Sequence, residues 1–410
     1  MNEKWIIIHV CSEEQAHFFL RFISSGNKNG YAFSFLTYTY SVYRFLHRRI
    51  ESENKVYFIN RHYYHSCTEK NFKLDEIHTL ECITKYVSKD DAYRAYYAAI
   101  SILEKLGKEN ISYIWCWNGC KIVDAALSDF AKKYSIKTLF FEIANIDGKI
   151  FVDPMGTNAR SFLYLHPKIL SSFHFNQDEY IKWRENYIKS KFSQVNIKQA
   201  KPLNIRKGVV NYLWDDYGFV LKNGVVARQF PRVTLKKKLN HIKYQFTRMD
   251  FSTLKYVFFP LQVSSDTQIL INGNVTLFEA IHQALEYAKK KDCYLVIKPH
   301  PAERDPLYLN KMHEILDSYS KIIFSNENTF LLLKNAEKVF TINSTVGLEA
   351  LILDRPVYIF GRALYEQFSK ENISQYIMGY LIDVDYWGDC DISNDDFLKI
   401  LARADFLNLF

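Results

Sequence analysis

Two pairs of polar residues in the second half of the chain have the types and spacing that could do chemistry. Lys298 and His300 are separated by one proline, and Ser344 and Thr345 are adjacent. Their ammonium, imidazole and hydroxyl groups are hydrogen-bond donors, and each pair lies at the end of an apolar run typical of a buried strand. In doubly wound sheets, ligands bind at the carboxyl ends of strands and anions bind at helix N-termini. The two pairs therefore predict a phosphate site between them.

The elements that must position these residues form a repeating pattern. Tyr294–Lys298 is expected to be a strand, because prolines follow it and cannot continue a ladder. Val339–Ile342 is expected to be a second strand, with Ser344 opening a helix over Val346–Leu353 and a third strand at Val357–Phe360. Strand, turn, helix and strand in this order predict a parallel, doubly wound α/β sheet.

Other polar residues of this half are expected beside the same site. Glu349 is one helical turn past Thr345 and on the same face, where it either binds ligand or is a solvated helix acid. Gln262 lies near the end of the expected strand Tyr256–Val263, and Ser265 and Asp266 follow that strand. These three residues could line a cleft.

The first half opens with an expected strand, Trp5–Val10, and an expected helix, Gln15–Ile23. This is a Rossmann-like opening without a GxGxxG loop, which argues against a dinucleotide site. Thr138–Glu142 is expected to be a strand that leaves Glu142 at its carboxyl end. α/β enzymes place their chemistry in polar loops at such ends. The loop residues of this kind are Asn145, Asp147, Asp153 and Asn158.

The length of 410 residues suggests two domains. We expect a Rossmann-like, acceptor-side domain over 1–195 and a basic, membrane-facing linker over 196–250. A nucleotide-binding Rossmann-like domain is expected over 251–385. A tail over 386–410 is expected to pack back on the first domain.

The linker contains a basic tract, because no acidic residue occurs between Tyr217 and Met249. A run of charge is often only a solvated face. Lysines and arginines interleaved with apolar residues also suit anionic lipid headgroups or an anionic glycan. Nucleic acid is disfavoured, since no binding motif accompanies the tract and the net charge of +8 is mild.

The seven cysteines are scattered and show no zinc-site spacing, which indicates reduced thiols and no metal site. No apolar stretch reaches the roughly 18 residues of a membrane span. We therefore expect a cytoplasmic protein, or one peripheral on the inner face of the cytoplasmic membrane.

The quoted segments resemble the capsular polysaccharide synthesis family, the KpsS/KpsC-type β-Kdo transferases. The resemblance is carried by LQVSSDTQI, YLVIKPHPAERD, TINSTVGLEAL, DRPVYIFGRALY and FFEIANIDGKIFVDPMGTNARS. It implies a GT-B glycosyltransferase fold, with two Rossmann-like domains facing each other across a cleft. It also implies CMP-Kdo as donor, a phosphatidylglycerol-type lipid acceptor at the inner membrane, retention of the β configuration, and other capsule assembly proteins as partners.

The resemblance also implies roles for the candidate residues. His300 and Ser344, with Lys298 and Thr345, would hold the CMP phosphate, and Glu349 would bind the ribose. Because a nucleoside monophosphate leaves, no metal or other cofactor is obligatory. Glu142 would be the nucleophile, with Asp153 and then Asp147 in reserve; Asn145 and Asn158 would orient the sugar or the acceptor.

Each role has a structural alternative. His300 could cap a strand, Ser344 could cap a helix, and Glu142 could support its loop. At the level of function, the rivals are a transferase with another CMP- or CDP-activated donor, such as sialic acid or a polyol phosphate, and a non-catalytic capsule assembly or export factor that binds glycolipid.

Overall fold

The structure is a computed structural model of the 410-residue chain. It describes residues 4–67, 79–84, 87–193, 205–227, 246–247, 249–263, 267–301, 303, 312, 315 and 319–408. The chain forms two units: Met1–His166, Pro202–Phe230 and Tyr380–Phe410 make the first, and Pro167–Lys201 and Pro231–Gly379 make the second.

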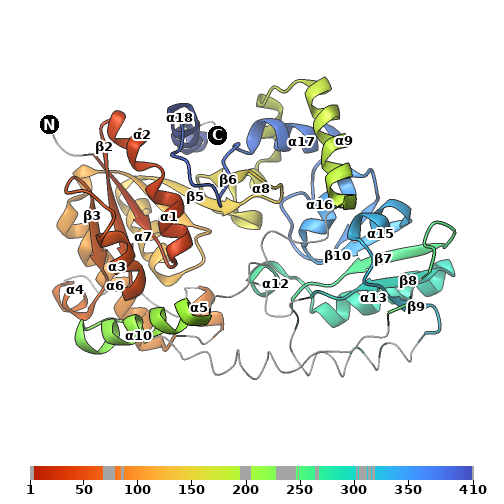
Figure 1. Cartoon of the computed structure of the whole chain (residues 1–410), viewed down its shortest axis with the longest axis horizontal. Coiled ribbons are helices and arrows are strands. Elements are labelled where there is room, and N and C mark those ends of the chain that lie inside the picture. Colours follow the sequence, from red (N-terminus) through yellow and green to blue (C-terminus); the bar gives the residue numbers. More distant parts are fainter. Residues whose placement is uncertain are drawn as a thin grey trace. The chain divides into compact units, whose positions relative to one another are not determined.

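The first unit is built on a six-stranded sheet (Figure 1). Its first five strands along the chain are parallel, and the last is antiparallel to its neighbour. In spatial order the strands are β3 (Lys55–Phe58), β2 (Tyr31–Thr37), β1 (Lys4–His9), β4 (Ile111–Trp117), β5 (Lys137–Ile143) and β6 (Ile150–Asp153). The central strands are apolar on both faces because helices cover both faces.

One face of this sheet packs against α6 (Lys89–Leu106) and α7 (Ile122–Tyr134). The other face packs against α1 (Glu13–Leu20) and α18 (Asn394–Ala402). The remaining described α-helices of the unit are α2 (Ile23–Lys28), α3 (Tyr40–His47), α4 (Arg61–Ser66), α5 (Leu80–Ile83), α8 (Phe162–Leu165) and α10 (Ile205–Leu221). This two-sided cover is the doubly wound arrangement.

The second unit has a five-stranded parallel sheet. In spatial order its strands are β11 (Val357–Ile359), β10 (Lys338–Thr341), β7 (Tyr256–Pro260), β8 (Tyr294–Lys298) and β9 (Ile322–Phe324). Its described α-helices are α9 (Gln177–Ser193), α12 (Thr267–Asn272), α13 (Leu277–Lys291), α15 (Thr329–Asn335), α16 (Thr345–Ile352) and α17 (Lys370–Gln375). α13 lies in the core on one face, and α15 in the core on the other.

The predicted fold class is confirmed: the protein is α/β, with two Rossmann-like units of the kind that GT-B enzymes combine. The strand expected at Tyr294–Lys298 has those bounds, and α16 begins at Thr345 directly after Ser344. Both follow from local signals, an apolar run ended by prolines and a serine before an apolar helix. The cleft between the units stays a prediction.

The unit boundaries differ from the predicted ones. α9 was expected in the first domain but groups with the second unit, where Arg184 donates to the carbonyl of Ile352 at 2.7 Å and to Asp354 at 2.8 Å. α10 groups with the first unit, where Asp215 accepts a hydrogen bond from the N–H of Ser41 at 2.8 Å. The C-terminal segment joins the first unit from Tyr380, ahead of the predicted start at 386.

Candidate functional sites in the two units

Lys298 and His300 stand at the carboxyl end of β8, as the sequence predicts. The Lys298 ammonium donates to the carbonyl of Glu327 at 2.6 Å and to the hydroxyl of Thr329 at 2.9 Å. Burial lowers the pKa of Lys298, against the opposing charges of Glu349 and Glu327. The ammonium therefore braces the loop before α15, and His300, which is half-buried, stands two residues beyond it.

Ser344 caps the N-terminus of α16. Its hydroxyl accepts the N–H of Val346 at 3.2 Å, and its own N–H donates to the hydroxyl of Thr341 at 3.1 Å. Thr345 begins the helix and its side chain is exposed. The capping alternative for Ser344 is thus observed, and its phosphate contact stays a prediction.

Gln262 joins the ends of two neighbouring strands. Its amide donates to the side chain of Asn343 at 3.0 Å and accepts the N–H of Asn343 at 3.3 Å. Gln262 follows β7 and Asn343 follows β10, so the pair draws the end of β7 to the turn before Ser344. Ser265 and Asp266, the other candidates on this loop, lie outside the described residues.

Glu349 is 8 % exposed, so the alternative of a solvated helix acid is wrong. Its carboxylate accepts a hydrogen bond from the hydroxyl of Tyr187 at 3.3 Å and lies 3.6 Å from the ammonium of Lys191. Both partners come from α9, which sequence reasoning had placed in the other domain. The carboxylate is therefore held in position by a second helix of its own unit.

In the first unit, Glu142 is the second-last residue of β5 and half-buried. Its carboxylate accepts the N–H of Ile143 at 3.2 Å. Asn145 and Asp147 follow in the loop to β6, half-buried and exposed respectively. Glu142 thus occupies the predicted strand end, and its role as nucleophile stays a prediction.

Asp153 corrects the sequence analysis, which held it as a reserve nucleophile. Its carboxylate is completely buried and accepts bonds from the hydroxyl of Tyr380 at 2.9 Å and from four backbone N–H groups. These donors, at 2.8 to 3.2 Å, are Met155, Gly156, Phe162 and Leu163. Burial raises the pKa of Asp153, and these hydrogen bonds oppose the rise. With its oxygens occupied and inaccessible, Asp153 braces the chain after β6.

Asn158 lies in the segment that Asp153 braces. It has a positive φ of 52° and opens a short 3₁₀ helix, Asn158–Arg160. Its carbonyl accepts bonds from the N–H of Ser161 at 3.1 Å and the hydroxyl of Ser161 at 2.6 Å. The structure gives Asn158 a clear backbone role; its role toward a sugar or acceptor stays a prediction.

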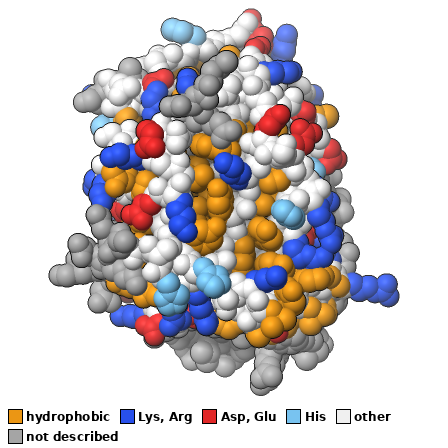
Figure 2. All heavy atoms as spheres, turned by 90° about the vertical axis from the view of Figure 1, so that its left-hand side faces the viewer, with side chains coloured by type: hydrophobic (Ala, Val, Ile, Leu, Met, Phe, Trp, Pro, Cys, Tyr) orange, Lys and Arg blue, Asp and Glu red, His pale blue; other side chains and the backbone are white. Residues whose placement is uncertain are grey.

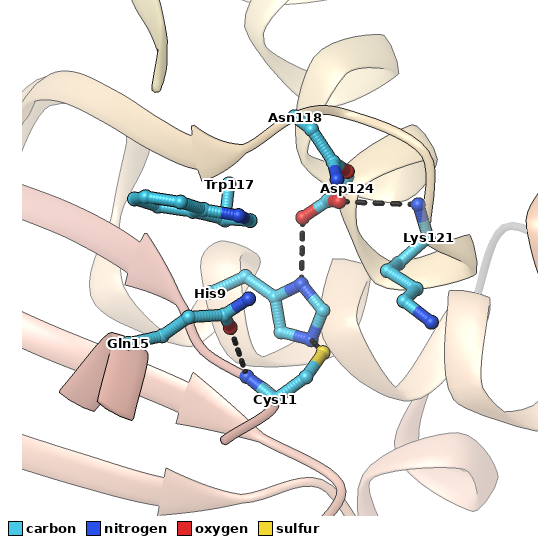
Figure 3. Close-up of a pocket in the computed structure, with 7 residues that line it drawn as sticks. All are labelled: His9, Cys11, Gln15, Trp117, Asn118, Lys121 and Asp124. Carbon is cyan, nitrogen blue, oxygen red and sulfur yellow. Dashed lines mark hydrogen bonds and ion pairs between the residues drawn. The ribbon is translucent and has the colours of Figure 1, made fainter. Parts of the chain in front are cut away.

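A polar cluster that the sequence analysis missed lies at the carboxyl ends of β1 and β4. His9 is the last residue of β1, and Asp124 is in the first turn of α7. Nδ1 of His9 lies 2.6 Å from Oδ1 of Asp124, and each side chain is 1 % exposed (Figure 3). Nε2 of the same ring lies 3.3 Å from Sγ of Cys11.

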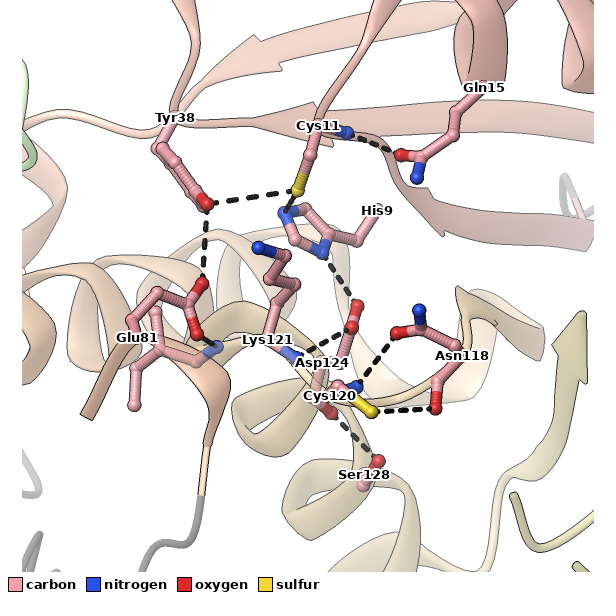
Figure 4. A network of polar contacts seen from close by, with 11 residues as sticks. His9, Cys11, Gln15, Tyr38, Glu81, Asn118, Cys120, Lys121, Asp124 and Ser128 are labelled. Atoms are coloured by element: carbon pink, nitrogen blue, oxygen red, sulfur yellow. Dashed lines mark hydrogen bonds and ion pairs between the residues drawn. The ribbon is translucent and has the colours of Figure 1, made fainter. Parts of the chain in front are cut away.

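More titratable groups surround this ring (Figure 4). The Cys11 sulfur lies 3.8 Å from the hydroxyl of Tyr38, which donates to Glu81 at 3.3 Å. Burial alone would lower the pKa of His9, but the charges of Cys11 and Asp124 outweigh it and raise the pKa to about 10. Burial raises the pKa of Glu81 and of Tyr38. His9 therefore holds a proton firmly among acidic neighbours.

The cluster opens into a hollow with an empty volume of about 200 Å³. Its lining residues are His9, Cys11, Gln15, Trp117, Asn118, Lys121 and Asp124. A strand-end histidine and cysteine were visible in the sequence, but Asp124 is 115 residues from His9, so no local spacing could pair them.

The similarity to known proteins lies mostly in the second unit. Residues 221–368 match the family model described as "Capsule polysaccharide biosynthesis protein". The Escherichia coli "Capsule polysaccharide export protein KpsS" is 30% identical over 148 residues, which are 34% of this chain and 36% of that protein. The Neisseria meningitidis "Capsule polysaccharide modification protein LipB" is 28% identical over 123 residues, 27% of this chain and 29% of that protein.

Among solved structures, the chain is similar to "Thermosulfurimonas dismutans KpsC, beta Kdo 2,7 transferase". That match has a TM-score of 0.41 at 17% identity and covers 75% of this chain and 90% of that one. The beta Kdo 2,4 transferase of the same organism's KpsC matches with a TM-score of 0.40 at 13% identity, over 73% and 88% of the two chains.

The fold and the strand-end residues are those of an α/β protein with paired Rossmann-like units. Residues 221–368 are similar to the capsule polysaccharide biosynthesis family, and the predicted resemblance is confirmed over that part of the chain. The matched part spans about a third of the length of the curated relatives. His300, Ser344 and Glu349 lie inside it, whereas Glu142 and the His9 cluster lie outside.

Proposed function

We propose that this protein is a glycosyltransferase of capsular polysaccharide biosynthesis that transfers β-Kdo from CMP-Kdo to a phosphatidylglycerol-type lipid acceptor, with retention. The observation that carries the proposal is the order of strands in the second unit. β8 and β10 are the two neighbours of β7, so His300, Gln262 and Ser344 follow three adjacent parallel strands.

The spacing of those strands suits a phosphate. β8 and β10 lie on either side of β7, so they are two strand intervals, or about 10 Å, apart. Side chains at the ends of both strands can reach one phosphate group at this distance. Ser344 opens α16, whose first N–H groups and dipole favour an anion. Glu349 lies one turn further along α16 and is held by Tyr187 and Lys191. We assign it to accept hydrogen bonds from the ribose of the donor.

The first unit would supply the acceptor side and the nucleophile. Glu142 is the carboxylate that we assign to attack on the donor sugar, since Asp153 is inaccessible. No metal is invoked, because CMP leaves as a monophosphate and donors of the second unit can stabilise its charge.

A lipid acceptor requires contact with a membrane surface, and α10 offers an apolar one. Seven apolar side chains on this helix are 36 to 65 % exposed: Val209, Val210, Leu213, Trp214, Tyr217, Val220 and Leu221. Figure 2, viewed from the side on which α3, α4 and α10 are drawn in Figure 1, shows apolar side chains gathered among lysines and arginines. Among the described helices, none is long and apolar enough to cross a membrane.

The test is release of CMP from CMP-Kdo with and without a phosphatidylglycerol-based acceptor. We expect acceptor-dependent release that falls at least about a hundredfold in His300→Ala, and that survives in His282→Ala, an exposed histidine of the same unit. If the nucleotide is released only from another CMP- or CDP-activated donor, that donor is the substrate and CMP-Kdo is not. Binding of anionic vesicles without release from any donor would instead support a non-catalytic assembly or export factor.

A further inference from the structure

The polar cluster of the first unit has the parts of a nucleophile–base–orienter triad. Cys11 Sγ lies 3.3 Å from Nε2 of His9, and Nδ1 of His9 lies 2.6 Å from Asp124. In this arrangement the imidazole takes the proton of the nucleophile while the carboxylate fixes the ring and stabilises its positive charge. The raised pKa of His9 means that the ring holds such a proton firmly.

The charges around the triad are mixed and come from several elements of the first unit. Tyr38 and Glu81 lie on one side of the sulfur, and Cys116 and Asp124 lie beyond the imidazole. The Lys121 side chain lies beside the His9 ring and the Cys11 sulfur in both close-up views (Figures 3 and 4). Burial would lower the pKa of Lys121, but Cys11, Glu81 and Asp124 raise it, so its positive charge is retained.

Cys11 differs from the other described cysteines because it lines the hollow and contacts an imidazole. Cys116 is completely buried, and burial raises the pKa of its thiol. Cys120 is 4 % exposed, and burial raises its pKa to about 11. Cys11 is half-buried, lines the hollow and contacts an imidazole. Cys390 is exposed, and a charged group beside it is the guanidinium of Arg21.

The hollow limits what can reach the sulfur. The empty volume of about 200 Å³ includes space open to solvent, and the enclosed part has room for about one water-sized group. It suits one small functional group rather than a nucleotide sugar. Asn118 and Lys121 line it and can donate to a developing oxyanion.

We propose that Cys11, His9 and Asp124 form a second reactive centre, in which the Cys11 sulfur takes a small acyl group from an ester. The sulfur attacks the carbonyl carbon, a C–S bond forms, and the bond from that carbon to the ester oxygen breaks. The proton shared by Cys11 and His9 lies on Nε2 before the attack, and it then passes to the departing oxygen, which leaves as an alcohol. Water then attacks the thioester, its proton returns through His9 to the sulfur, and a carboxylic acid leaves.

The first test compares two cysteines within the intact wild-type protein and needs no nucleotide sugar. We expect iodoacetamide at neutral pH to modify Cys11 at least about tenfold faster than the exposed Cys390, as read by peptide mass spectrometry. Equal rates, or a faster Cys390, would overturn the proposal. Because no variant is involved, a folding defect cannot confuse this result.

The second test uses p-nitrophenyl acetate as the probe. We expect a burst of p-nitrophenol, with acetyl on the Cys11 peptide, that is lost in Cys11→Ser and kept in the matched control Cys390→Ser. His9→Gln should slow the burst at least about a hundredfold while a folded protein is verified by its unfolding transition. No acetyl on Cys11, or an undiminished burst in Cys11→Ser, would refute acyl transfer by this centre.

Discussion

His9 and Asp124 are 115 residues apart in the chain and 2.6 Å apart in the core of the first unit, with 1 % of either side chain exposed. An ion pair this deep is strong only while both partners carry their charge. The contact therefore ties the stability of the unit to the protonation of one ring.

The stability of the first unit should fall as the pH rises from about 6.5 to about 10. The pKa of His9 is raised from 6.5 to about 10 in the folded protein, so the folded state binds the proton more tightly than the unfolded chain does. The stabilisation that the His9 proton gives is complete below the unfolded pKa of 6.5. It is lost as the pH approaches the folded pKa of about 10. Thermal unfolding from pH 6 to 10 should show a steeper decline of Tm for wild type than for His9→Gln. Buried thiols such as Cys116 cause a decline of Tm that is the same in both proteins. Parallel curves of Tm against pH would show that His9 makes no contribution to the pH dependence.

Asp153→Asn should damage folding rather than chemistry. The substitution replaces a charged acceptor by an amide whose NH₂ group faces donors, and we expect a loss of about 2–4 kcal/mol in the free energy of unfolding. Asp147→Asn, at an exposed position of the same region, is the matched control and should cost under about 0.5 kcal/mol. Urea unfolding measures both. A stable Asp153→Asn protein that had lost all transfer activity would restore Asp153 as a chemical group.

Tyr187→Phe should weaken donor binding through Glu349. It removes the hydrogen bond of 3.3 Å that holds this carboxylate, worth about 1 kcal/mol, so KM for the nucleotide donor should rise about fivefold with kcat nearly unchanged. Tyr180→Phe, on the same helix, is the control. A drop in kcat with constant KM in Tyr187→Phe would place Glu349 in the chemical step instead of in binding.

Leu213→Glu combined with Val220→Glu should release the protein from membranes. Each of these side chains is 61 % exposed on α10, and burying one in a lipid interface is worth about 1.5–3 kcal/mol. Co-sedimentation with vesicles rich in phosphatidylglycerol should fall more than about a hundredfold. Leu398→Glu, which is 46 % exposed on α18, should bind as wild type does. Unaltered binding of the α10 variant would assign membrane contact to another surface.

The sequence was most informative where the signal was local. β8 and the start of α16 followed from an apolar run before prolines and from Ser344 before an apolar helix. Long-range contacts decided the rest. Asp153 looked like a free loop acid until Tyr380, 227 residues further on, proved to be one of its donors. The alternative of a solvated Glu349 stayed open because its partner Tyr187 is 162 residues away. Asp124 could not be recognised as the partner of His9 for the same reason.

The two units are made of three and two chain segments, five in all, so the chain passes between them four times. The core of the first unit needs Val384, Tyr386 and Phe397 from the last segment as well as Phe18 and Phe19 from the first. No single crossover between two genes can therefore exchange one whole unit for another. An exchange of either unit would need several coordinated crossovers, because each unit is assembled from separate segments of the chain.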